Sequence, residues 1–232
     1  MSYLWQEFNI KTYPSETLVF QNGIFCSELS DYKSLDFDKK HNLISVIKTP
    51  KLPIHIIYIG EISGNIDLNI NIKSFDTKVY MTAKIINKKP AFFNILVNNY
   101  GENSVFDGQI ISQNYDNIKI NTNAKHFVKK SSVFIQTRVL AHKNTNTDLN
   151  GVAYIEKDVP ECDSNISFSV MADESAKITL KPCQYIKSIP NQANHSASLY
   201  KPKDNQINYL RSAGLSGEEV ERVLQEAFLA EQ

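Results

Sequence analysis

The sequence has few cysteines and no excess of charge. Its three cysteines, Cys26, Cys162 and Cys183, are far apart and form no Cys-x-x-Cys pair, so neither a disulfide framework nor a zinc knuckle is indicated. Unpaired thiols of this kind are typical of a reducing compartment. The 25 basic and 25 acidic residues balance to a net charge of zero. This balance argues against binding to nucleic acid or to an anionic membrane surface, because both need a basic excess.

Long apolar runs are also missing. The longest, LPIHIIYIG at residues 52–60, is far too short to span a bilayer. The N-terminal stretch MSYLWQEFNIKTYPSE has no basic start followed by an apolar run, so no secretory signal is predicted. We therefore expect a cytoplasmic protein, or a stromal one if it is encoded in a plastid-type organelle.

The common catalytic signatures are absent as well. No HExxH, GxSxG, Walker A or GxGxxG motif occurs. Closely spaced carboxylates such as Asp36 and Asp38 are too generic to indicate the acidic site of a polysaccharide lyase. We expect a protein that is not an enzyme.

The body of the chain is rich in short β patterns. NIDLNINIKS alternates Ile and Leu with Asn and Asp, which is the period of a half-buried strand. Similar segments follow at short intervals, including KVYMTAKII, AFFNILV, DNIKIN, SVFIQTRVLA and NISFSVM. Between them, Asn, Gly and Asp supply turns. Many short strands fit either a sandwich or barrel, or a stacked solenoid.

Internal similarity favours the solenoid. Residues 139–155, VLAHKNTNTDLNGVAYI, and residues 170–186, VMADESAKITLKPCQYI, have equal length and begin and end alike. SVFDGQI at residues 104–110 also resembles TDLNGVA at residues 147–153. Each unit reads as strand, polar turn, strand, which is the pattern of one solenoid coil. Asn suits such turns, because it tolerates the left-handed conformation and can form ladders of hydrogen bonds between coils.

The C-terminal tail changes to a helical pattern. A first helix is predicted over about residues 205–213, with Gly214 at a left-handed C′ position. Ser216 and Glu219 then form a capping box for a second helix. This helix has one apolar face, made of Val220, Val223, Leu224, Ala227 and Phe228. We predict three parts: a short N-terminal segment (1–40) leading into the solenoid, a β-helix (41–200) and a C-terminal helical hairpin (201–232).

The role of this hairpin has several interpretations. A DNA-reading helix-turn-helix is disfavoured, because the second helix is rich in acidic residues that phosphates would repel. The hairpin could cap the last coil of the solenoid, or it could be a docking surface for another protein. For the second interpretation we single out these residues: Tyr209, Leu210, Val220, Val223, Leu224, Ala227 and Phe228.

Four segments resemble the SufB/SufD family of iron–sulfur cluster assembly proteins. INYLRSAGLSGEEVERVLQEAF in the tail is similar to the family's C-terminal Tyr-Leu-x-Ser-x-Gly-Leu-Ser signature. Residues 125–158 are similar to its His-x-x-x-x-(Thr/Ser)-Ser-Val run and the following turn, and residues 172–186 to a segment with a matching Pro182 and Ile186. ETLVFQNGIFCSELS at residues 16–30 resembles the stretch before the β-helix in SufD. The four segments occur in the family's order.

The resemblance implies a fold and two partners. The fold is a right-handed parallel β-helix with a C-terminal α-helical hairpin, which agrees with the solenoid predicted from the strand pattern. The partners are a SufC-like ATPase that docks on the C-terminal helices and a SufB-like subunit that pairs through the β-helix. No tightly bound cofactor is expected. A transient iron–sulfur cluster at a subunit interface is the only metal that the resemblance suggests.

The sequence also departs from the family pattern. The family's Cys-Ser-His-Gly-Ala-Thr becomes ANHSAS at residues 193–198, so His195 is kept and the cysteine two positions before it is lost. Ser196 stands where SufB-like chains have Glu. Because the cysteine that would receive sulfur in SufB is also missing, the chain is SufD-like. SufD proteins usually carry a long helical domain before LVFQNG, and in this sequence about fifteen residues stand there.

Few residues are candidates for cluster ligation. His195 is the main one, as a secondary imidazole ligand beside thiolates from another chain. Cys183 is a weaker one, because free cysteines such as Cys26, Cys162 and Cys183 are usually small buried hydrophobic residues. His126 matches a family position, and an inward polar residue in a coil explains it equally well.

Three hypotheses about function remain. The first is a non-catalytic, SufD-like scaffold subunit of an iron–sulfur assembly complex. The second is a structural β-solenoid whose open ends stack into filaments. The third is a solenoid lyase acting on acidic polysaccharides.

Overall fold

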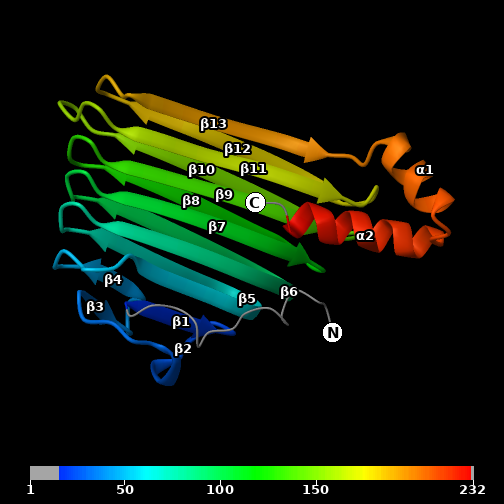
Figure 1. Ribbon diagram of the computed structural model, residues 1–232, viewed down its shortest axis with the longest axis horizontal. Helices are drawn as coiled ribbons and strands as arrows, with labels where there is room; N and C mark the ends of the chain where they lie inside the picture. Colours follow the sequence, from blue (N-terminus) through cyan, green and yellow to red (C-terminus); the bar gives the residue numbers. More distant parts are fainter. Residues whose placement is uncertain (1–15, 231–232) are drawn as a thin grey trace.

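The chain folds as a stack of parallel strands that winds through about six turns and ends in two helices (Figure 1). The computed structural model describes residues 16–230, so most of the N-terminal segment before β1 lies outside the described part. Strands pair in parallel throughout the body of the stack. The predicted parallel β-solenoid with a C-terminal helical hairpin is confirmed.

In chain order, the elements are β1 (Thr17–Gln21), β2 (Ile24–Phe25), the 3-10 turn η3 (Ser27–Leu29), β3 (Leu35–Asp38), β4 (Leu43–Val46), β5 (Ile54–Ile72), β6 (Lys78–Asn99), β7 (Val105–Asn114), β8 (Ile118–His126), β9 (Ser132–Ala141), β10 (Asn146–Ile155), β11 (Asp163–Ala172), β12 (Lys177–Ile186), β13 (Gln192–Tyr200), α1 (Asp204–Ser212) and α2 (Gly217–Ala230). The long strands β5 and β6 each bend and contribute to both faces of the solenoid. One face then continues through β7, β9, β11 and β13, and the other through β8, β10 and β12.

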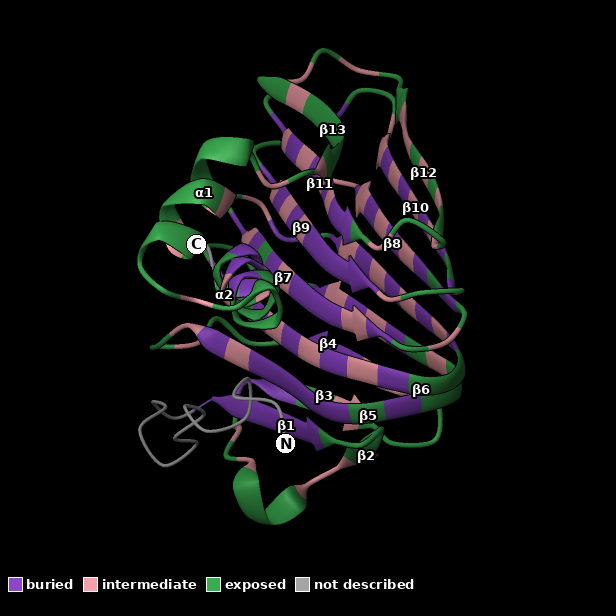
Figure 2. Cartoon of the chain, turned by 90° about the vertical axis from the view of Figure 1, so that its right-hand side faces the viewer, coloured by how far each residue is buried: buried purple, intermediate pink, exposed green. Residues whose placement is uncertain are grey.

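The alternating sequence pattern explains the core. In β8, Ile118 and Ile120 are buried, whereas Lys119 between them is exposed. The same alternation runs along most of the middle strands (Figure 2). Because successive side chains of a strand point to opposite sides, each coil sends every second residue into one continuous apolar core.

The register shows which sequence similarities reflect repeats. Residues 139–155 and 170–186 do align, since Val139 pairs with Val170 and Ile155 pairs with Ile186. The likeness of residues 104–110 to 147–153 was misleading, because the first segment lies in β7 and the second in β10, on the other face. Alternating polar residues make such false matches common in strands.

Asparagines form the expected ladders, on the outer face as well as in turns. Asn98 Nδ2 donates to Asn71 Oδ1 at 2.9 Å, and Asn94 Nδ2 donates to Asp67 Oδ1 at 3.0 Å, in each case one coil apart. In the turns, several asparagines have positive φ angles: Asn22, Asn42, Asn103 and Asn144. Asn therefore serves both to close turns and to link coils.

The first end of the solenoid is closed by short antiparallel strands. β1 pairs in parallel with β5, and β2 folds back on β1 in antiparallel fashion. β4 pairs in parallel with β5, and β3 folds back on β4 in the same way. Strands therefore begin within the segment that we expected only to lead into the solenoid, and they belong to the same sheet.

The two helices lie where they were predicted. α1 starts and ends one residue earlier than expected, and Gly214 has a φ of 92° just after the C-cap residue Ala213. Ser216 N donates to Glu219 Oε2 at 2.8 Å, and Glu219 N donates to Ser216 Oγ at 3.3 Å. The capping box of α2 is thus present. Neither helix in the part of the chain that the structure describes is long and apolar enough to cross a bilayer.

Candidate functional site

The last coil leaves an open end on the solenoid. β12 and β13 stand at the two ends of the strand order, and no other described strand pairs with their outer edges. Their side chains are much less buried than those of the coils below (Figure 2). Leu199 is 66% exposed and Ile186 is 41% exposed. Unpaired backbone groups next to exposed apolar side chains are the features of a surface that accepts another strand or chain.

His195 lies in the middle of β13, within this open end. It pairs with Ile166 of β11, whose side chain is buried in the core. In a parallel stack, paired residues point to the same side, so His195 lies on the inner side of the last coil. It is exposed because no further coil covers it.

Cys183 does not join His195. It pairs with Val152 of β10, and the neighbours of Val152, Gly151 and Ala153, are the buried residues of that strand. Cys183 therefore faces outward from the opposite sheet and is half-buried, so it is not a core residue. Among residues 16–230, no group of three or more His, Cys, Asp or Glu side chains is arranged to hold a metal ion.

The C-terminal hairpin lies along the side of the solenoid and not over its last coil (Figure 1). Val220, Leu224 and Phe228 of α2 pack against outward side chains of β7, β9 and β11. Of the two interpretations of the hairpin, the cap over the last coil is therefore wrong. The physical reason is an apolar patch on the outer face, formed by Ile111, Leu140 and Met171.

This packing divides the residues that we singled out for docking. Val220, Leu224 and Phe228 are buried, so they hold the helix in place and are not accessible to a partner. Leu210 and Val223 are half-buried, Ala227 is exposed, and Tyr209 is 73% exposed. The part of the hairpin that is free to contact another protein is centred on Tyr209 and the acidic outer side of α2.

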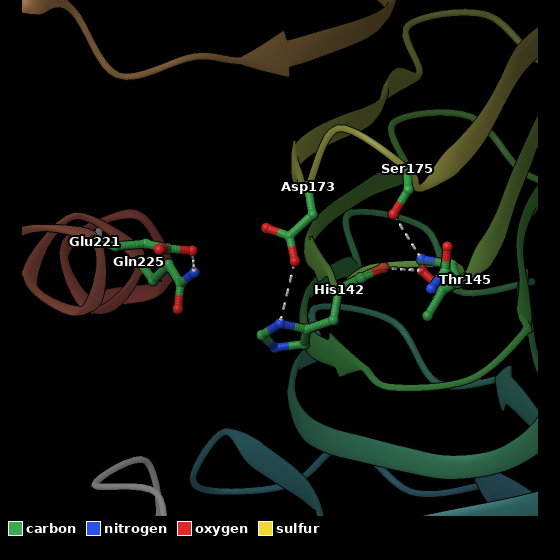
Figure 3. A network of polar contacts seen from close by, with 7 residues as sticks. His142, Thr145, Asp173, Ser175, Glu221 and Gln225 are labelled. Carbon is green, nitrogen blue, oxygen red and sulfur yellow. Dashed lines mark hydrogen bonds and ion pairs between the residues drawn. The ribbon is translucent and has the colours of Figure 1, made fainter. Parts of the chain in front are cut away.

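A polar network lies where α2 meets the turns of the solenoid (Figure 3). His142 follows β9, its ring stacks on Tyr115 with centroids 4.1 Å apart, and its Nδ1 is 3.8 Å from Asp173 Oδ2. Burial lowers the pKa of His142, while the carboxylates of Asp173 and Glu221 act in the opposite direction. The sequence carried no signal for this histidine, because its neighbours come from three separate segments.

A second polar cluster is buried at the opposite corner of the coils. His126 is fully buried, and its Nδ1 is 2.8 Å from Ser131 Oγ, which donates its own proton to Val128 O at 2.9 Å. Nδ1 therefore carries the ring proton. Ser131 Oγ is also 3.5 Å from the buried thiol of Cys162. Burial lowers the pKa of His126 to about 4, so this histidine is neutral and structural, one of the two interpretations that we considered.

Comparison with known families agrees with this arrangement. The model described as "SUF system FeS cluster assembly, SufBD core domain" matches residues 73–228. The chain belongs to the SufBD family. The match runs from the turn after β5 to Phe228 in α2, so it includes the open end, His195 and the hairpin. No curated protein matches the chain significantly. This family is one of iron–sulfur cluster assembly proteins.

Proposed function

We propose that this SufBD-family chain is a SufD-like, non-catalytic scaffold subunit of an iron–sulfur cluster assembly complex. The observation that carries the proposal is the open end of the solenoid, with His195 on its inner side and exposed apolar residues beside it. In the proposed complex, a SufB-like chain covers this end and a SufC-like ATPase contacts the hairpin near Tyr209. The complex works in a reducing compartment, the cytoplasm or a plastid-type stroma.

Charge and exposure support the two proposed contacts. β12 and β13 present unpaired backbone donors and acceptors over about ten residues each. A partner with a matching open solenoid end would extend both faces with parallel or antiparallel pairs. On α2, the exposed side carries Glu218 and Glu226, which suit a basic surface on the partner. These two contact regions are separate, so each can be disrupted without the other.

Co-purification with both partners tests the proposal. We expect the wild-type chain, co-expressed with a SufB-like subunit and a SufC-like ATPase, to retain both on an affinity column. Leu199→Asp places a charge on the open end and should reduce recovery of the SufB-like subunit at least about tenfold. Tyr209→Ala should reduce recovery of the ATPase to a similar extent, because exposed tyrosines often anchor interfaces.

Two exposed residues away from these regions serve as controls. Ile24 in β2 is 70% exposed, and Phe75 in the turn after β5 is 62% exposed. Ile24→Asp and Phe75→Ala should leave recovery of both partners unchanged. A wild-type chain that retains neither partner would contradict the proposal. If light scattering instead shows polymers that grow with concentration, the structural solenoid, our alternative, is favoured.

Within the complex, we propose that His195 contributes one ligand to a nascent cluster, which is cargo and not a resident cofactor. The thiolates must come from the SufB-like chain, because no cysteine of the described residues lies on the inner side of the last coil. After anaerobic reconstitution, His195→Ala should lower bound iron and sulfide by about half or more. Equal iron and sulfide in wild type, His195→Ala and the neighbouring Asn194→Ala would show that His195 is not a ligand.

A further inference from the structure

The outward residues beneath α2 differ from those on the rest of the same face. Along β9, the outward side chains of Phe134 and Gln136 are half-buried, but those of Arg138 and Leu140 are buried. The change occurs where α2 lies against β9. In the neighbouring strand, Ile111 pairs with Arg138. Arg138 is therefore part of the surface that α2 covers.

Three polar atoms of this region have no hydrogen-bond partner. Arg138 is 5% exposed and its buried Nη1 is unpaired. Gln113, which pairs with Leu140, has a buried Oε1 that accepts no hydrogen bond. Nε2 of His142 is also buried and has no hydrogen-bond partner. Among the described residues, no carboxylate forms an ion pair with Arg138. Glu221 on α2 instead accepts a hydrogen bond from Gln225 at 3.1 Å.

The contacts of α2 thus contribute to the free energy of docking with opposite signs. Its apolar side chains gain from leaving water, chiefly Val220, Leu224, Phe228 and Leu229. In the docked state, Nη1 of Arg138 and the two further polar atoms are buried without hydrogen bonds, which is unfavourable. Water would reach these atoms again if the helix moved away. The docked and detached states are therefore closer in free energy than the apolar contact alone would make them.

The connections of α2 permit such a movement. α1, which precedes it, has no buried residue, and the turn between the helices contains the exposed Gly214. No β-ladder hydrogen bond involves the hairpin, so its detachment leaves every coil paired. We propose that α2 is a releasable strap, which detaches as a unit and uncovers Arg138 within an apolar patch. This proposal concerns the isolated chain and does not depend on the proposed function.

Hydrogen exchange of the isolated, full-length chain tests the strap. We expect the amides of α2 to exchange through a local opening, with protection on the order of 100-fold below that of β9 and β10. Arg138→Met keeps the length of the side chain and removes the unpaired charge, so it should raise the protection of α2 about tenfold. Arg222→Met removes a charge from the exposed side of α2 and should change its protection less than about twofold.

Two outcomes would overturn the proposal. One is that α2 in the wild type exchanges only together with β9 and β10, which would make it part of the globally unfolding unit. The other is that Arg138→Met leaves the protection of α2 unchanged or lowers it, which would mean that the guanidinium does not disfavour docking. Protection of β9 and β10 in the same experiment reports whether the variant is folded.

Discussion

Replacing Phe93 by alanine should lower the free energy of unfolding by about 3–5 kcal/mol, the usual cost of removing a buried phenylalanine ring. Phe93 is fully buried in the core, and its ring lies edge-on to that of Tyr58 with centroids 5.1 Å apart. The rigid coils above and below cannot move into the space that the ring leaves. The effect is therefore expected near the upper part of this range.

The residue before it provides a matched control. Phe92 points to the outer face of β6, where it is half-buried and lies under the ammonium group of Lys119. Phe92→Ala should cost about 1 kcal/mol or less. Urea unfolding of both variants, followed by circular dichroism, measures the difference. Similar losses for the two variants would show that the inward and outward positions of β6 are assigned wrongly.

The fold should also lose stability in acid because of His126. In the folded chain the pKa of His126 is lowered from 6.5 to about 4 by burial. The unfolded chain therefore binds more protons between these two values, and the stability due to the neutral ring, fully present above pH 6.5, is lost as the pH falls toward 4. The total loss is up to about 3 kcal/mol, since one pKa unit corresponds to about 1.4 kcal/mol.

The solenoid itself suggests the control for this prediction. In the preceding coil, Asn99 occupies the position that pairs with His126. Its side-chain amide donates from Nδ2 to Ser104 O and accepts at Oδ1 from Gly101 N, so its polar atoms are hydrogen-bonded. His126→Asn should fold in the same way and show a flatter stability curve between pH 6.5 and 4. Unfolding curves at several pH values measure this slope. Parallel curves for wild type and variant would mean that His126 does not titrate with folding.

The strand pattern predicted the middle of the solenoid well, because inward residues such as Ile118 and Ile120 are apolar and outward ones are polar. It predicted β13 poorly. The inner side chains of β13 are those of Ala193, His195, Ala197 and Leu199, and only some of them are apolar because no coil lies above them. A strand at the end of a stack is covered on one side only. Its inner residues therefore need not be apolar, and the alternating pattern by which strands are recognised in a sequence is weak.

The site was predicted only in part for a similar reason. Residues that match a family motif, such as His195 and Tyr209, could be found from their neighbours in sequence. Arg138 and His142 could not, because their surroundings come from β7, β11 and α2. Val220, Leu224 and Phe228 of the apolar face of α2 were recognised, but sequence alone could not show that they pack against the solenoid's own side.

The difference between the two ends of the solenoid limits how many chains can join through their strand edges. At the first end, the edge strands β2 and β3 have two and four residues and belong to antiparallel hairpins. At the last end, β12 and β13 offer edges of ten and nine residues. A polymer grows only if each chain has two ends that can bind further chains. Here each chain has one open end, and a single partner covers it. Growth through this edge therefore stops at two chains, whether the second is a copy or a related subunit.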